Sequence, residues 1–175
     1  MVMVLFSCSN SLDKVKQFID TDTINGVLAY DVTITRSDSG IIQAKLIAPL
    51  MHSTENDSSI LEFPKGFMAY LYEEDTIPTS MMKAEYGIRY DKEELVIARD
   101  SVVVKNIDTQ ETLYTEQLFW NQKTKRIYTQ TFVKITSPDK VIYGDSLSAN
   151  EDFSQREIHG MSATLEIEEE EENNY

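Results

Sequence analysis

One pattern of turn and strand recurs along the sequence at a nearly constant interval. Asp91, Asn121 and Asn150 each open a polar turn, and they lie 30 and then 29 residues apart. Asp and Asn suit such turns because their side chains hydrogen-bond the neighbouring backbone and tolerate unusual φ angles. A repeat of this size cannot bury its apolar face alone, so neighbouring repeats must stack on one another. The strand-like runs that follow the turns are I-A-R-D-S-V-V-V, I-Y-T-Q-T-F-V-K-I and I-H-G-M-S-A-T-L-E-I.

A second set of polar turns lies between these units, at Asn106–Thr109 and Ser137–Lys140. Each unit therefore consists of strand, turn, strand and turn, with side chains alternating between two faces. The arrangement predicts an all-β, layered or rolled structure built from stacked antiparallel hairpins. In the run from 127 to 135, one face carries Ile127, Thr129, Thr131, Val133 and Ile135, and the other carries Tyr128, Gln130, Phe132 and Lys134.

Further strands are predicted upstream of the repeats. Val27–Thr35 and Ile41–Leu50 flank a short polar cluster, which is typical of a hairpin. Leu61–Tyr72 and Met81–Tyr90 are two more strand candidates, and Gly66 indicates a bend near the start of the first.

The length of 175 residues suits one domain. We expect residues 1–25 to be a lipobox-like N-terminus and tether, residues 26–167 a β-domain, and residues 168–175 an acidic disordered tail. The formal charge is −14, from 16 basic and 30 acidic residues. This balance argues against nucleic acid, and against binding an anionic membrane through a basic patch, because no excess of Lys and Arg is present to neutralise phosphates.

The single cysteine, Cys8, ends the apolar run M-V-M-V-L-F-S-C and is followed at once by a polar stretch. One cysteine excludes an intrachain disulfide. The arrangement is typical of a bacterial lipobox, in which a peptidase cleaves before the cysteine and the thiol receives a diacylglycerol. We therefore expect Cys8 to carry a lipid anchor. The alternative is a buried cysteine within a strand.

No set of residues in the sequence indicates catalysis. His52 and His159 lie 107 residues apart without a zinc-type motif, so no metal site is predicted. Ser80 and Lys83 fit the acylation pattern S-x-x-K, but its S-D-N and K-T-G partners do not occur. We expect a protein that is not an enzyme and that uses no cofactor.

The chain is rich in aromatic side chains and methionines, with nine Tyr, seven Phe, seven Met and one Trp. They could be ordinary β-core, or they could line a groove for acyl chains. Each buried methylene contributes roughly 0.8 kcal/mol, so such a groove needs no reactive residue. A surface or periplasmic β-sandwich lipoprotein that binds carbohydrate or protein is the alternative. The predicted lipid-groove residues are Phe119, Trp120, Tyr128, Phe132 and Val133.

Four segments in a fixed order carry a family resemblance. They are A-R-D-S-V-V-V from residue 98, E-T-L-Y-T-E-Q-L-F-W-N from 111, I-Y-T-Q-T-F-V-K-I from 127 and V-I-Y-G-D-S-L-S-A-N from 141. Together they resemble the lipopolysaccharide-export periplasmic protein family LptC, in particular its Bacteroidetes branch of lipoproteins. The resemblance extends from about residue 25 to 165.

The resemblance implies an open, twisted β-jelly-roll at the periplasmic face of the inner membrane. The protein would receive lipopolysaccharide from the inner-membrane ABC transporter and pass it to a periplasmic LptA-like bridge protein. Acyl chains would lie in the groove while phosphates and sugars stay in water. Ser9 follows the cysteine, which leaves sorting to the outer membrane open.

Bridge proteins of this kind join by adding strands to exposed sheet edges. The expected edges are Val27–Thr35 and Met161–Ile167, represented by Val27, Tyr30, Val32, Met161 and Leu165. Gly144, in the phrase Y-G-D-S-L, is expected to occupy a turn that needs a positive φ angle.

Overall fold

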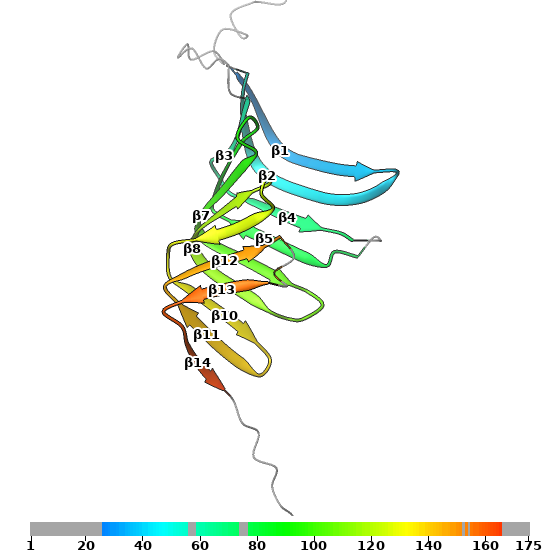
Figure 1. Ribbon diagram of the computed structural model, residues 1–175. Helices are drawn as coiled ribbons and strands as arrows, with labels where there is room; N and C mark the ends of the chain where they lie inside the picture. Colours follow the sequence, from blue (N-terminus) through cyan, green and yellow to red (C-terminus); the bar gives the residue numbers. More distant parts are fainter. Residues whose placement is uncertain (1–25, 56–58, 74–76, 152, 154, 166–175) are drawn as a thin grey trace, which may run out of the picture.

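The computed structural model describes residues 26–55, 59–73, 77–151, 153 and 155–165, and these form strands and turns without a helix. All the paired strands are antiparallel, and Figure 1 shows their hairpins stacked from β1 and β2 at one end to β14 at the other. The prediction of an all-β fold is confirmed. The strands are β1 Gly26–Asp38, β2 Ile41–Glu55, β3 Ser59–Phe63, β4 Phe67–Leu71, β5 Ser80–Ala84, β6 Tyr86–Tyr90, β7 Leu95–Asn106, β8 Thr112–Asn121, β9 Arg126–Thr129, β10 Val133–Ser137, β11 Lys140–Gly144, β12 Ser146–Asn150, β13 Arg156–His159 and β14 Ser162–Leu165.

Long strands divide this sheet into two layers. The first half of β7, Leu95–Arg99, pairs with β6, whereas Val103–Asn106 pairs with β5. β8 crosses in the same way, with Thr112–Thr115 on β10 and Phe119–Asn121 on β9. Layer 1 therefore contains β3, β6, β9, β12 and β13, and layer 2 contains β4, β5, β10, β11 and β14. Because β2, β7 and β8 run through both layers, the result is a jelly-roll-like roll, as the family resemblance implies.

The chain passes from one layer to the other along a single line of corners, which we call the crease. Several corners need left-handed backbone, at φ angles of 78° for Gly66, 62° for Asp100 and 64° for Gly160. Hydrogen bonds join neighbouring corners, for example from the Glu85 N–H to the Asp100 carbonyl at 2.9 Å. The crease consists of Gly66, Glu85, Asp100–Ser101, Thr131, Asp145 and Gly160.

The crease explains the interval of about thirty residues in the sequence. Thr131 and Asp145 are 14 residues apart, and Asp145 and Gly160 are 15 residues apart. One hairpin in layer 2 and one in layer 1 together therefore take up close to thirty residues. The turns at Asp91, Asn121 and Asn150 consequently all fall at the free end of layer 1. The prediction of stacked hairpins is confirmed.

Asparagine side chains stabilise the turns as expected. The Oδ1 atoms of Asn121, Asn150 and Asn106 each accept a hydrogen bond of 2.9 Å from a backbone N–H three to five residues further on. Since these N–H groups have no ladder partner, the amide oxygen replaces the missing acceptor.

Four of the predicted strand runs are interrupted at the crease. The sequence predicts a bend in Leu61–Tyr72 but no break in Met81–Tyr90, in the run from 127 to 135 or in the run that begins at Ile158, and each of the four contains two strands that belong to different layers. The alternation of the third run gives no sign of its corner, because Ile127 and Ile135 are both buried on the same side of the chain.

The hydrophobic core lies between the two layers. Val133 and Ala149 are 0% exposed, and Leu118 and Leu147 are 2% exposed. The predicted apolar face of the run from 127 to 135 is therefore the inner face. The buried residues of the core are Ala48, Phe63, Phe67, Ala84, Ala98, Val102, Val104, Leu113, Leu118, Ile127, Val133, Ile135, Ile142, Leu147 and Ala149.

A chain of threonine hydroxyl groups satisfies the buried corner between β9 and β10. Thr131 Oγ1 lies 2.8 Å from Thr115 Oγ1 and 2.9 Å from Thr129 Oγ1. Thr115 also donates to the Phe132 carbonyl at 3.0 Å. Unpaired carbonyls are costly in a buried place, so these hydroxyl groups explain the phrase T-Q-T within an otherwise apolar face.

The expectation of a positive φ angle at Gly144 is wrong, since the glycines with positive φ in the described residues are Gly40, Gly66 and Gly160. Gly144 is needed for space. A Cβ atom there would collide with Ile158 Cγ2 and would come within 3.1 Å of the His159 carbonyl oxygen.

Candidate functional site

A pocket of about 270 Å³ lies between the two layers near the C-terminal end of the stack. Its floor is apolar, because inward positions of β7, β8, β10 and β12 supply Val104, Leu113, Ile135 and Leu147. The full lining is Ser80, Val104, Asn106, Thr109, Glu111, Leu113, Ile135, Leu147, Phe153 and Arg156.

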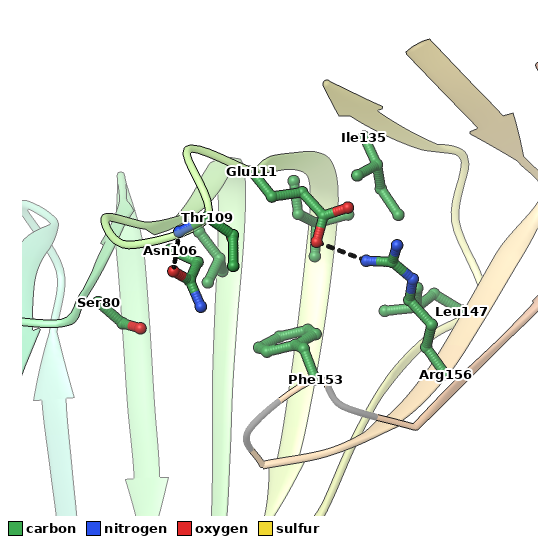
Figure 2. A pocket seen from close by; sticks show the side chains of 10 residues that line it. Ser80, Asn106, Thr109, Glu111, Ile135, Leu147, Phe153 and Arg156 are labelled. Carbon is green, nitrogen blue, oxygen red and sulfur yellow. Dashed lines mark hydrogen bonds and ion pairs between the residues drawn. The ribbon is translucent and has the colours of Figure 1, made fainter. Parts of the chain in front are cut away.

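An ion pair spans the mouth of this pocket. Arg156 Nη1 donates to Glu111 Oε2 at 2.6 Å, as Figure 2 shows. The side chains are 26% and 22% exposed, so the pair is in contact with water but largely covered. Glu111 belongs to layer 2 and Arg156 to layer 1, and the ion pair therefore joins the two layers at the mouth of the pocket.

Local structure fixes both ends of the pair. Glu111 follows the turn between β7 and β8, and its carbonyl accepts a 2.9 Å hydrogen bond from the Asn106 N–H. Arg156 is the first residue of β13 and pairs with Ala149 of β12. Phe153, with a φ angle of 57°, also lines the pocket, and Figure 2 shows its ring beside the mouth.

The pocket is apolar at its floor and polar at its mouth. Its lining offers hydroxyl, amide and one charged pair above an apolar floor. In the residues that the structure describes, no three His, Cys, Asp or Glu side chains come together as a metal site would need. The arrangement suits an amphiphile whose hydrocarbon part enters and whose polar part stays at the mouth.

Two groups with shifted pKa values lie outside the pocket. Burial, followed by the hydrogen bond that its hydroxyl donates to Glu62 Oε1 at 2.8 Å, raises the pKa of Tyr86 from 10.0 to about 12. The hydroxyl of Ser137 lowers the pKa of Asp139. Neither group lines the pocket, so neither supplies acid–base chemistry there.

The predicted groove residues do not form one surface. Trp120 packs against the core from the inner face of layer 1, and Val133 is completely buried in the core. Phe119 and Tyr128 lie on the opposite face, where their rings stack at 5.0 Å. Phe132 is 58% exposed and stacks on another outer ring. None of the five lines the pocket.

The predicted partner edges lie at the two ends of the stack. Val27, Tyr30 and Val32 belong to β1, which pairs with β2 alone among the described strands. Val27 is 58% exposed and Tyr30 is 71% exposed. At the other end Met161, 63% exposed, precedes β14, whose last residue is Leu165 and whose described partner is β11. Cys8 lies outside the described residues.

The sequence did not predict the two charged residues at the mouth of the pocket, Glu111 and Arg156. Glu111 and Arg156 are 45 residues apart and share no motif. The residues of the pocket floor could in principle be predicted from the sequence, because Leu113 and Ile135 are inward positions of neighbouring strands. Nothing in the alternation itself says which of the inward positions leave space between the layers.

Within the described part of the chain, no helix is long and apolar enough to cross a membrane. Fold and site together define a β-jelly-roll-like protein with a pocket between its layers. A family model described as "Lipopolysaccharide-assembly, LptC-related" matches residues 1–165, and the chain belongs to this LptC family. No curated protein matches the sequence. The family places the chain in lipopolysaccharide transport, in association with the periplasm and the inner membrane.

Proposed function

We propose that the protein is a non-catalytic component of the lipopolysaccharide transport bridge. It receives lipopolysaccharide from the inner-membrane ABC transporter and passes it to the next periplasmic bridge protein, of the LptA-like kind. The observation that carries this proposal is the apolar pocket between the layers, closed at its mouth by a single ion pair.

Acyl chains match the inner surface in chemistry and in extent. Each buried methylene contributes roughly 0.8 kcal/mol, so ten of them supply ~8 kcal/mol before the entropy of binding is subtracted. A pocket of 270 Å³ accommodates part of such a chain. Partly buried apolar side chains extend the inner surface toward the N-terminal end, namely Leu46, Leu61, Ala69, Met82 and Trp120.

Exposed edges provide the means of joining neighbours. β1 is 13 residues long and carries exposed apolar side chains, among them Val27 and Tyr30. A long apolar edge of this kind is a template for strand addition. We propose β1 as the edge toward the transporter and β14 as the edge toward the next bridge protein.

The N-terminal segment provides the attachment. We propose that Cys8 carries the lipid anchor and that residues 1–25 tether the transfer domain, residues 26–167, to the inner membrane. Several acyl chains on one residue would hold the protein firmly, whereas one chain alone binds marginally. We propose that residues 168–175 are an acidic tail.

Photocrosslinking in cells tests where lipopolysaccharide lies. Ser80 lines the pocket, whereas the adjacent Met81 projects from the opposite face of β5. We expect a photoreactive residue at Ser80 or Trp120 to label lipopolysaccharide, and the same residue at Met81 or Phe132 to label it weakly. Equal labelling from both faces would contradict an interior path, and labelling of soluble glycan from Phe132 alone would favour a carbohydrate-binding surface.

A further inference from the structure

The ion pair at the mouth of the pocket has a role beyond closing it. We infer that Arg156 is the receptor for the anionic group of a phosphorylated amphiphile, and that Glu111 occupies this receptor when no ligand is bound. This inference rests on the proposed function, because it takes the pocket to be the acyl site.

Charge singles out Arg156. The chain carries a formal charge of −14, yet the cation in the pocket lining is Arg156 and the anion is Glu111. A guanidinium group presents paired N–H donors that match phosphate oxygens in a bidentate manner. The apolar floor and the guanidinium belong to the same small space, so one ligand can reach both.

Glu111 is placed to compete with the ligand. Its carboxylate oxygen accepts from Arg156 at 2.6 Å, which is the contact that a phosphate oxygen would make. The Glu111 carbonyl is separately held by the Asn106 N–H, so the carboxylate can turn away while the turn stays in place. Because a phosphate oxygen makes the same charge-assisted contact, it can replace the carboxylate without leaving the partly covered guanidinium unpaired.

The consequence is selectivity. An uncharged acyl chain gains only contacts with the apolar floor, and it offers Arg156 no new partner if its entry separates the ion pair. A phosphorylated acyl chain replaces Glu111 at Arg156 and recovers a charge-assisted hydrogen bond. The pocket should therefore favour phosphorylated amphiphiles, and removal of the competing carboxylate should increase that preference.

Titration calorimetry with dodecyl phosphate, dodecanol and inorganic phosphate separates these contributions. We expect wild-type protein to prefer dodecyl phosphate over dodecanol by on the order of tenfold. Arg156→Gln should remove the preference, so that dodecyl phosphate and dodecanol bind with similar affinity, and Arg156→Lys should keep part of the preference. Glu111→Gln should bind dodecyl phosphate about fivefold more tightly than wild type, and should prefer it over dodecanol more strongly than wild type does. Thermal unfolding of each variant serves as the control for folding.

A retained preference in folded Arg156→Gln, or unchanged dodecyl phosphate affinity in Glu111→Gln, would overturn the inference while dodecanol binding still supported the acyl pocket. Inorganic phosphate that binds as tightly as dodecyl phosphate would also overturn it, since the site would then be one for free phosphate. Absence of binding by dodecanol and dodecyl phosphate alike would refute the acyl pocket itself, and the inference with it.

Discussion

Replacing Ser80 with tryptophan is expected to abolish most acyl-chain binding while leaving the fold intact. Ser80 is a small, partly buried side chain at the start of β5 that lines the pocket without belonging to the buried core. An indole at this position would occupy space that methylenes otherwise fill. Losing two buried methylenes alone costs about 1.6 kcal/mol, or roughly fifteenfold in affinity. Equilibrium binding of a radiolabelled acyl probe measures the effect.

Met81→Trp is the matched control for this substitution. Met81 adjoins Ser80 in β5 but projects from the outer face of layer 2, so the same indole should leave binding within about twofold of wild type. Equal losses in the two variants would show that acyl chains do not enter between the layers. Wild-type binding in folded Ser80→Trp would show the same.

Replacing Gly144 with alanine is expected to destabilise the protein by about 3 kcal/mol, because the added Cβ collides with Ile158 Cγ2. That methyl group belongs to a β-branched side chain with few rotamers, and the His159 carbonyl oxygen would also lie only 3.1 Å from the new Cβ, so relief requires a shift of the backbone at the end of β13. Chemical denaturation measures the change in the free energy of unfolding.

Gly40→Ala separates crowding from backbone strain. Gly40 has a φ angle of 84° in the hairpin between β1 and β2, and no heavy atom lies within 4 Å of the site of an added Cβ. Alanine there meets only the left-handed backbone penalty, which is about 1 kcal/mol. If Gly144→Ala cost no more than Gly40→Ala, the conclusion that Gly144 is needed for space would be wrong.

The sequence predicted the stacking of hairpins because that stacking is local in origin. Turn chemistry at Asn121 and Asn150 and the alternation between them require only neighbouring residues, and both survive in the structure. The crease was harder to predict. Gly66 marks one corner, but Glu85 and Thr131 occupy corners with ordinary residues that carry no turn signal.

The site was largely hidden from sequence reasoning for two physical reasons. Alternation places the neighbours Phe132 and Val133 on opposite faces, so the predicted groove residues could not all line one surface, and what alternation leaves open is which face is the inner one. The two charged residues at the mouth of the pocket come from different layers, and only the folding of the chain brings them into contact. A contact between groups 45 residues apart, such as that between Glu111 and Arg156, leaves no periodic trace.

Quenching of Trp120 fluorescence tests most directly whether hydrocarbon enters between the layers. Trp120 is the single tryptophan of the chain and packs against the core from the inner face, where its Nε1–H donates to Glu151 Oε1 at 2.7 Å. A brominated acyl chain quenches an indole only on close approach. We predict strong quenching by a brominated fatty acid and none by the same acid without bromine. Saturating binding of the brominated acid with Trp120 emission unchanged would contradict an acyl path between the layers.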